Sequence, residues 1–220
     1  MRKNLVLLIT ATASFFAPYA SFASSDAPAV SADSARQKLV DGNRRYVEGT
    51  MTHPDQTADR RGEVAKGQHP FAAIVSCADS RVPPEVVFDQ GLGDLFVIRV
   101  AGNIADDAAL GSLEYAVEHL GVGYIMVLGH ERCGAVDATL KGGEAPGHIG
   151  TLVREIQPAV KSVKGKDGDP LDNAVRANIS AVVKKLKAAG PILSARVKSG
   201  TLTVVGAHYD LDDGAVSILP

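Results

Sequence analysis

Tryptophan is absent from this 220-residue chain, aromatic residues make up only 5% of it, and cysteine occurs twice. Basic residues are not in excess, because 23 lysines and arginines stand against 25 aspartates and glutamates. No basic patch with interleaved aromatic residues is present, so nucleic acid is not an expected partner. The chain also lacks internal repeats and a dinucleotide fingerprint, because Gly91-Leu92-Gly93 has no third glycine and opens no obvious helix.

Long hydrophobic runs are missing after the N-terminal segment, and no later run reaches the roughly 20 residues that a membrane-spanning helix needs. Residues 1–23 have the pattern of a secretory signal: a charged start at Met1-Arg2-Lys3, an apolar stretch over residues 5–16, and small residues before a cleavage position near Ala23. We therefore expect a periplasmic or secreted protein that has no membrane segment in its mature form.

The rest of the chain is long enough for one hydrophobic core. Residues 24–33 are rich in serine and alanine and predict a flexible lead-in. Residues 34–220 are then expected to form a single domain, because 45% of the chain is hydrophobic and its length suits one core.

Short continuous apolar runs are typical of strands that are covered on both faces. Such runs occupy residues 71–75, 95–98, 124–128 and 202–205, with a last short strand expected at 216–218. Helical patterns alternate with them, from residue 106 or 107 to 120 and from 171 to 189, and a further helix is expected to begin near Asp33 or Ser34. This alternation predicts an α/β fold with a mainly parallel central sheet flanked by helices, and an N-terminal helical arm.

Each of the two cysteines stands close to another residue type that binds metals. Cys77 is followed by Asp79 and Arg81, and Cys133 lies three residues after His130. Cys77 follows the first predicted strand and His130 the third, and the carboxyl ends of parallel strands are where ligand sites form. Two thiolates and one imidazole favour tetrahedral zinc, and three protein ligands with an exchangeable fourth position are typical of a catalytic zinc site.

Asp79 and Arg81 point to the same side as Cys77 if this segment is extended. A free Asp79 is itself a good zinc ligand and could close the fourth position. Held by Arg81 in a two-pronged ion pair, it could instead accept a hydrogen bond from a zinc-bound water and orient it. An ordinary surface ion pair is the simpler alternative for these two residues.

A disulfide is the alternative for the cysteines, because two cysteines in an oxidising compartment pair by default. A Cys77–Cys133 bridge would oxidise both thiolates and exclude the metal. Neither His130 nor the Asp79–Arg81 pair would be needed beside such a bridge, so the neighbouring residues favour the metal.

At these residues the chain resembles a β-class carbonic anhydrase, of a bacterial and exported kind. Residues 77–83 are similar to the family's first metal motif, and residues 129–135 are similar to its second. Residues 96–103 resemble the family's second strand and following turn, and residues 206–214 resemble its closing hairpin. The resemblance spans about residues 34–220.

The resemblance implies one zinc ion per chain, bound by Cys77, His130 and Cys133. Asp79 would be a fourth ligand only in a closed form, and would otherwise act with Arg81 as a catalytic dyad. The implied reaction is the reversible hydration of carbon dioxide to bicarbonate and a proton by zinc-bound hydroxide. A homodimer or homotetramer is expected.

Two further residues are implied to contact the substrate. Gln90 precedes the strand that starts at residue 95, where the family often has a glutamine that hydrogen-bonds substrate. Backbone N–H groups around Gly134 could polarise an oxygen of carbon dioxide, since glycine lets the main chain approach closely.

Some family members switch activity through bicarbonate bound near a tryptophan, an arginine and a tyrosine. Arg99 and Tyr209 match the latter two positions, but Ile74 stands where the tryptophan would be. We therefore expect an open site without this switch. Two other functions remain: hydrolysis of carbon disulfide or carbonyl sulfide by the same ligands, and a non-catalytic binding protein stabilised by zinc or a disulfide.

Overall fold

The computed structural model describes residues 30–220, so the predicted signal segment 1–23 and most of the predicted lead-in 24–33 lie outside the described residues. The described chain folds around one five-stranded sheet with the strand order β2-β1-β3-β4-β5. Neighbouring strands are parallel except for β5, which is antiparallel to β4. The predicted α/β fold with a mainly parallel central sheet is confirmed.

All five strands lie where the apolar runs predict them. They are β1 (Ala72–Ser76), β2 (Leu95–Arg99), β3 (Tyr124–His130), β4 (Thr203–Tyr209) and β5 (Val216–Ile218). β3 and β4 extend beyond their apolar runs, because the two strands pair along their full length, from Tyr124 opposite Thr203 to His130 opposite Tyr209. β3 is buried throughout, as expected for a central parallel strand.

Helices connect the strands. They are α1 (Ala32–Glu48), α2 (Ala58–Val64), α3 (Pro84–Val87), the short 3₁₀ helix η1 (Ala101–Asn103), α4 (Asp107–His119), α5 (Gly134–Lys141), α6 (Ile149–Ser162), α7 (Pro170–Ala188) and α8 (Ile192–Lys198). The N-cap side chains of Ser31, Asp106 and Asp169 accept hydrogen bonds from first-turn amides of α1, α4 and α7, which fixes where these helices begin.

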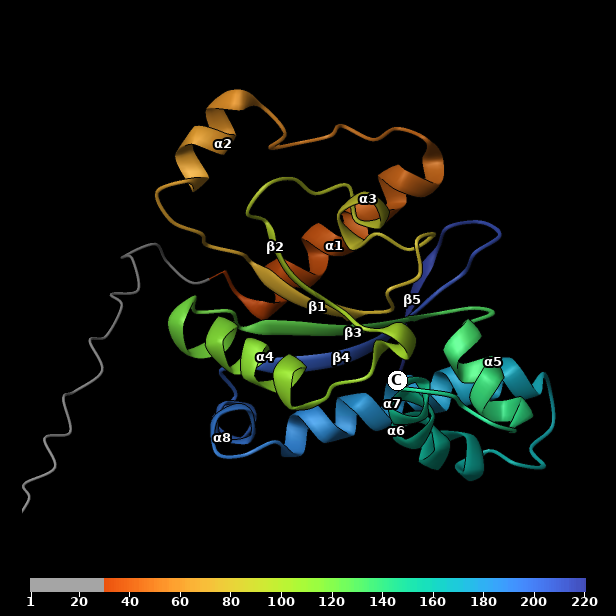
Figure 1. Cartoon of the computed structure of the whole chain (residues 1–220). Helices are drawn as coiled ribbons and strands as arrows, with labels where there is room; N and C mark the ends of the chain where they lie inside the picture. The colour runs from red at the N-terminus through yellow and green to blue at the C-terminus, as the bar shows by residue number, and fades with distance from the viewer. Residues whose placement is uncertain (1–29) are drawn as a thin grey trace, which may run out of the picture.

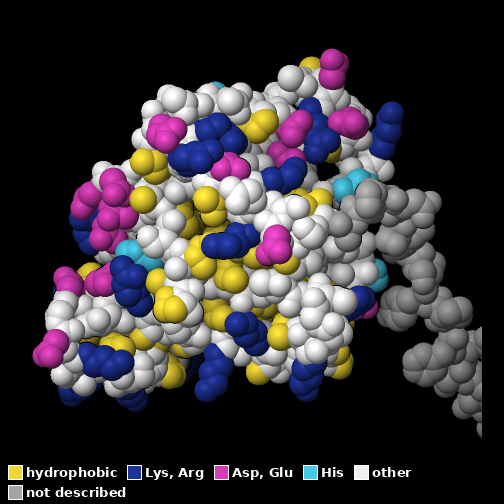
Figure 2. All heavy atoms as spheres, turned by 180° about the vertical axis from the view of Figure 1, so that it is seen from behind, with side chains coloured by type: hydrophobic (Ala, Val, Ile, Leu, Met, Phe, Trp, Pro, Cys, Tyr) yellow, Lys and Arg dark blue, Asp and Glu magenta, His cyan; other side chains and the backbone are white. Residues whose placement is uncertain are grey.

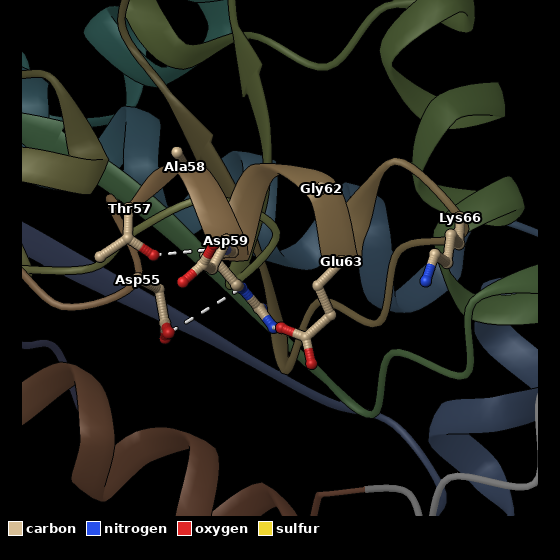
Figure 3. A pocket seen from close by; sticks show the side chains of 8 residues that line it. Asp55, Thr57, Ala58, Asp59, Gly62, Glu63 and Lys66 are labelled. Carbon is tan, nitrogen blue, oxygen red and sulfur yellow. Dashed lines mark hydrogen bonds and ion pairs between the residues drawn. The ribbon is translucent and has the colours of Figure 1, made fainter.

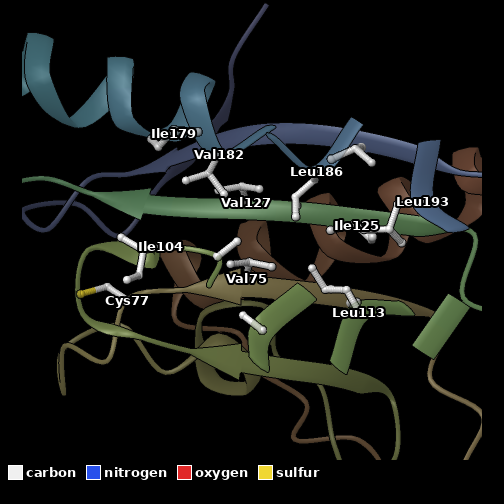
Figure 4. Packing of buried hydrophobic residues seen from close by; sticks show 14 of the residues in the cluster. Val75, Cys77, Ile104, Leu113, Ile125, Val127, Ile179, Val182, Leu186 and Leu193 are labelled. Atoms are coloured by element: carbon white, nitrogen blue, oxygen red, sulfur yellow. The ribbon is translucent and has the colours of Figure 1, made fainter. Parts of the chain in front are cut away.

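The helices cover both faces of the sheet, with α1 to α3 on one side in Figure 1 and α4, α6, α7 and α8 on the other. The α1 side has its own apolar cluster, in which Ala35 and Leu39 of α1 pack with Ile74 of β1. The cluster on the opposite face is larger and includes Val127, Ile179 and Leu186 (Figure 4). The N-terminal helix is therefore part of the domain's own packing.

The described surface is mixed in charge. In the view of Figure 2, basic and acidic side chains are interspersed and form no continuous basic surface on that face. Within residues 30–220, no helix is long and apolar enough to cross a membrane.

The end of β3 is held close to α7 by a glycine. A Cβ atom at Gly129 would lie 2.4 Å from Cγ1 of Ile179, so only glycine lets the helix pack this closely. His130 follows directly and ends the strand. The close packing of α7 on Gly129 therefore lies directly beside the position of His130 at the end of β3.

Candidate metal centre

The two predicted metal motifs meet at one end of the sheet. Cys77 follows β1 directly, His130 is the last residue of β3, and Cys133 is the N-cap of α5. Their ligand atoms all lie within 4.8 Å of one another, and all three residues are buried. Residues 56 positions apart in the chain therefore form one cluster, as their places after two strands predict.

The strand order explains why the cluster forms here. β2 lies on one side of β1, whereas β3 lies on the other, so the direction of strand succession reverses between β1 and β3. In open α/β sheets, ligand sites form at the carboxyl ends of the strands at this point of reversal. Cys77 and His130 occupy the carboxyl ends of those two neighbouring strands.

His130 presents one nitrogen to the cluster. Its Nδ1 lies 2.7 Å from the carbonyl oxygen of Glu131 and donates a hydrogen bond to it, which leaves the lone pair on Nε2. That Nε2 is buried and has no hydrogen-bond partner in the described chain; Oδ2 of Asp79 is 3.7 Å away. A buried imidazole nitrogen without a partner, beside two sulfurs, is the arrangement expected of a metal ligand.

The sulfur geometry fits zinc and not a disulfide. Sγ of Cys77 lies 4.0 Å from Sγ of Cys133, and both cysteines are free. A disulfide would need about 2.05 Å. Two sulfurs bound tetrahedrally to one zinc at about 2.3 Å lie about 3.8 Å apart. The donor set, the spacing and the unpartnered imidazole nitrogen therefore all suit a zinc ion.

Hydrogen bonds stabilise a thiolate at Cys77. Its pKa is lowered, first because the Cys133 thiol donates to its sulfur, although burial opposes the shift. The backbone N–H of Gly102 also donates to this sulfur at 3.3 Å. The pKa of Cys133 is raised in turn, first by its hydrogen bond to Cys77 and then by burial.

Backbone geometry brings His130 and Cys133 together. Arg132, between them, has a φ of 50°, a left-handed conformation that is unusual for a residue with a side chain. Its guanidinium donates two hydrogen bonds to Asp212, at 3.0 and 2.7 Å, so the turn is fastened to the loop between β4 and β5. The strained turn ends β3 and starts α5 within three residues.

Asp79 and Arg81 form the predicted ion pair. Oδ1 of Asp79 accepts hydrogen bonds from the backbone N–H and the Nε of Arg81, at 2.9 and 3.0 Å, and Oδ2 accepts one from Nη2 at 2.8 Å. These bonds hold the pKa of the Asp79 carboxyl well below its usual range, against a smaller effect of burial. The carboxylate therefore stays ionised beside the cluster, with its orientation set by Arg81.

Comparison with known proteins identifies the family to which this cluster belongs. The family model described as carbonic anhydrase matches residues 72–216, which include every residue of the cluster. Carbonic anhydrase 2 of Mycobacterium tuberculosis is 44% identical over 184 residues, 82% of this chain and 89% of that protein. The carbonic anhydrase of Mycolicibacterium smegmatis is 40% identical over 188 residues, covering 84% of this chain and 91% of its own.

Solved structures agree with the sequence relatives. The Coccomyxa β-carbonic anhydrase in complex with acetazolamide superposes with a TM-score of 0.68 at 30% identity, over 82% of this chain and 84% of that one. A tetrameric β-carbonic anhydrase from Sordaria macrospora gives a TM-score of 0.67 at 27% identity, over 72% and 85% of the two chains. The chain belongs to the β-class carbonic anhydrases. Its reaction is the reversible hydration of carbon dioxide.

In this carbonic anhydrase Arg99 supports the metal loop. Its Nε donates to the carbonyl oxygen of Cys77 at 3.0 Å, and its Nη2 donates to the carbonyl oxygen of Asp79 at 2.5 Å. The hydroxyl of Tyr209 lies 3.2 Å from that of Tyr46 in α1. The sequence pattern singled out Arg99 only for its match to a bicarbonate site, and the loop contact was missed because it joins a side chain to backbone oxygens. The expected lack of a bicarbonate switch stays a prediction.

Gln90, one of the two predicted substrate contacts, lies apart from the three metal-ligand candidates. Gln90 is buried, donates from Nε2 to the carbonyl oxygen of Phe88 at 2.8 Å, and lines a cavity of about 370 Å³ with Gln56 and Leu92. None of the three metal-ligand candidates lines that cavity. A substrate role for Gln90 stays a prediction.

Gly134 is the first residue of α5, directly after Cys133. A Cβ atom there would meet nothing within 4 Å, so packing does not demand the glycine. Its predicted contact with substrate likewise stays a prediction.

A hollow of about 710 Å³ beside α2 is a separate feature (Figure 3). It is lined by charges of both signs, and Arg60 pairs there with Glu63 at 3.0 Å and lies 3.9 Å from Asp55. None of the predicted catalytic, substrate or metal residues lines it. The carbonic anhydrase chemistry therefore belongs to the cysteine–histidine cluster.

Proposed function

We propose that this carbonic anhydrase uses one zinc ion per chain, held by Cys77, His130 and Cys133, with Asp79 outside the coordination sphere. The observation that carries the proposal is the buried Nε2 of His130, which faces two sulfurs and has no other partner among residues 30–220. The three hydrogen bonds that Asp79 accepts from Arg81 support the open form, because they would have to break or bend for the carboxylate to reach a metal.

A zinc ion with three protein ligands supplies a nucleophile for carbon dioxide at neutral pH, because it lowers the pKa of a coordinated water. The chain's own residues position that chemistry. Asp79, kept ionised by Arg81, is a hydrogen-bond acceptor 3.7 Å from the imidazole nitrogen. Arg99 holds the backbone of the same loop through the carbonyl groups of Cys77 and Asp79.

The metal proposal is tested by zinc content. We expect about one zinc per chain in the wild type, and less than a tenth of that in Cys77→Ser and His130→Ala. Ser80→Ala changes an exposed side chain in the same loop and is expected to retain its zinc. Wild-type protein without zinc after expression in zinc-supplemented medium would contradict the proposal. Zinc-loaded protein that hydrolyses carbonyl sulfide or carbon disulfide faster than it hydrates carbon dioxide would favour the rival substrates.

We also propose that the protein is a homodimer or homotetramer in which the edge strand β2 lies at an interface. β2 pairs with β1 on one side only among the described strands, and all five of its residues are partly exposed although four are apolar. Leu92, just before β2, is 44% exposed. An unpaired apolar edge favours association with another chain. The tetrameric state stated for the Sordaria protein is in line with this assembly.

Export is proposed from the sequence pattern of residues 1–23. We expect the mature protein to begin near Ser24 and to be periplasmic or secreted. Mass spectrometry of the protein recovered from periplasm and medium tests this. Recovery only from the cytoplasm, with residues 1–23 intact, would contradict it.

A further inference from the structure

Helix α7 carries one polar side chain on a buried face that is otherwise apolar. The buried residues of this helix are Ala174, Val175, Asn178, Ile179, Val182 and Leu186. Asn178 is only 2% exposed. Burying an amide without hydrogen bonds is costly, so the partner of Asn178 is expected to matter.

The partner of Asn178 leads directly to the metal cluster. Nδ2 of Asn178 donates to the carbonyl oxygen of Gly102 at 2.8 Å, across 76 residues of sequence. The backbone N–H of the same Gly102 donates to Sγ of Cys77 at 3.3 Å. A side chain in the middle of α7 is thus connected to a metal-ligand sulfur through a single residue of η1.

Gly102 is held in a conformation that few residues adopt. Its φ is 72°, and a Cβ atom there would lie 2.6 Å from Cδ1 of Ile156 and 3.3 Å from Cβ of Ala135. The turn is therefore enclosed by α5, α6 and α7, and glycine suits it because it has no side chain to clash with these helices or to disfavour the positive φ. The hydrogen bond from Asn178 fixes the carbonyl end of Gly102.

We propose that Asn178 is a positioning residue for the Cys77 thiolate. By holding the carbonyl of Gly102, it keeps the Gly102 N–H directed at the sulfur. A hydrogen bond to a ligand sulfur withdraws charge from it, and supporting contacts of this kind orient metal ligands and raise metal affinity. Asn178 therefore increases metal affinity and makes the Cys77 sulfur a weaker electron donor. This inference rests on the proposed zinc site and adds a residue that does not touch the metal.

Two substitutions on the same helix test the inference. Asn178→Ser is too short to reach Gly102, and serine in a helix can bond to the carbonyl four residues earlier. Asn173→Ser is the matched control, because Asn173 also donates to a backbone carbonyl, that of Asp167 at 2.9 Å, but at the exposed start of α7. Zinc affinity is measured by competition with a chromophoric chelator. We expect a 10–100-fold loss for Asn178→Ser and none for Asn173→Ser.

A spectroscopic signature separates positioning from mere packing. In the cobalt(II)-substituted full chain, the sulfur-to-cobalt charge-transfer band reports how electron-rich the thiolates are. Loss of the N–H donor is expected to move this band to longer wavelength in Asn178→Ser and to leave it unmoved in Asn173→Ser. A folded Asn178→Ser protein with wild-type affinity and an unmoved band overturns the inference.

If Asn178→Ser does not fold, the wild-type protein still tests the hydrogen bond from Gly102 to Cys77 on which the inference depends. In the ¹¹³Cd-substituted, ¹⁵N-labelled protein, a scalar coupling between ¹¹³Cd and the Gly102 amide proton supports the hydrogen bond to the sulfur, and its absence overturns the inference. The zinc proposal fails separately: wild-type protein that binds no zinc overturns both, whereas zinc-binding wild type with an unaffected Asn178→Ser overturns only the role of Asn178.

Discussion

At the level of single residues, neighbouring atoms restrict what each side chain of the metal centre can do. The carbonyl oxygen of Glu131 occupies Nδ1 of His130, which leaves only Nε2 for a ligand. Arg81 occupies both oxygens of Asp79, so the carboxylate is oriented and ionised but not free to move. These restrictions limit a group of common residue types to one arrangement.

Replacing Arg81 tests this restriction. In Arg81→Leu, Asp79 loses the two hydrogen bonds from the arginine side chain and keeps the one from the backbone N–H of residue 81. The pKa of Asp79 is therefore expected to rise, and its carboxylate is expected to turn toward the metal. We expect kcat/KM for carbon dioxide hydration to fall about 10–100-fold while zinc content stays near one per chain. Stopped-flow hydration with measured zinc content checks this. Arg61→Leu, which alters an arginine in α2, is the control, and an Arg81→Leu enzyme as active as that control would contradict the assigned role.

Single-residue roles were predictable where they depend on residue type and nearby spacing. Cys77, Asp79, Arg81, His130 and Cys133 fall into two short motifs, and the structure brings these motifs together. The supporting contacts were not predictable, because they join a side chain to backbone atoms that are distant in sequence. Arg99 reaches Cys77 across 22 residues, and Asn178 reaches Gly102 across 76. No pattern of residue types in the sequence predicts which distant backbone carbonyl a side chain will bond.

At the level of elements, buried Asp89 joins α1 to the loops around α3. Its carboxylate accepts hydrogen bonds from Nε of Arg45 at 2.6 Å, from the backbone N–H and hydroxyl of Thr52 at 3.0 and 3.1 Å, and from the N–H of His53 at 2.9 Å. Burial alone would raise the pKa of Asp89, but these donors lower it from 3.8 to about 2. The ionised carboxylate therefore stabilises the folded chain.

The sign of this pKa shift predicts a pH dependence. A carboxyl whose pKa is lower in the folded state stabilises the protein above about pH 4, and this contribution is lost as the pH falls toward 2. Asp89→Asn is expected to lower the free energy of unfolding by about 1–3 kcal/mol at pH 7 and by progressively less toward pH 2. Urea unfolding at a series of pH values measures it, with Asp59→Asn at an exposed position as the control. An equal loss at pH 7 and pH 2.5 would show that the charge of Asp89 does not matter.

Element prediction succeeded where the apolar pattern is continuous. All five strands, α4 and α7 lie close to their predicted ranges, because buried strands and amphipathic helices impose regular patterns. α5, α6 and α8 were not predicted. α5 begins at the residue after Cys133, α6 contains Pro158, and α8 has only seven residues. Short helices like these are stabilised by packing on the sheet more than by their own sequence.

At the level of the whole molecule, the order of the strands decides both the site and the exposed edge. Reversal between β1 and β3 brings the two metal motifs together, and the same order leaves β2 at the edge. α1 packs its apolar face on its own sheet, while Val40 and Val47 of that helix remain exposed by 42% and 45%. The domain thus has a complete core and further apolar surface outside it.

The proposed interface can be tested at one exposed residue. Leu92→Asp places a charge beside the β2 edge, and burying that charge in an interface is costly. We expect sedimentation velocity to show a wild-type dimer or tetramer, and a shift of Leu92→Asp toward the monomer at low protein concentration. Ile149→Asp changes an exposed apolar residue at the start of α6 and is expected to leave the assembly unchanged. A Leu92→Asp protein with the wild-type sedimentation coefficient would place the interface elsewhere.

The central claim is that metal held by the cysteine–histidine cluster carries the hydration activity. The most direct measurement is stopped-flow carbon dioxide hydration by the mature chain before zinc removal, after stripping with a strong chelator, and after zinc is returned. Activity should fall in proportion to zinc lost and recover when about one equivalent per chain is restored. Cys133→Ser should remain inactive after the same addition. Hydration that persists at full rate in fully stripped protein, or that zinc cannot restore to a folded chain, would contradict the account.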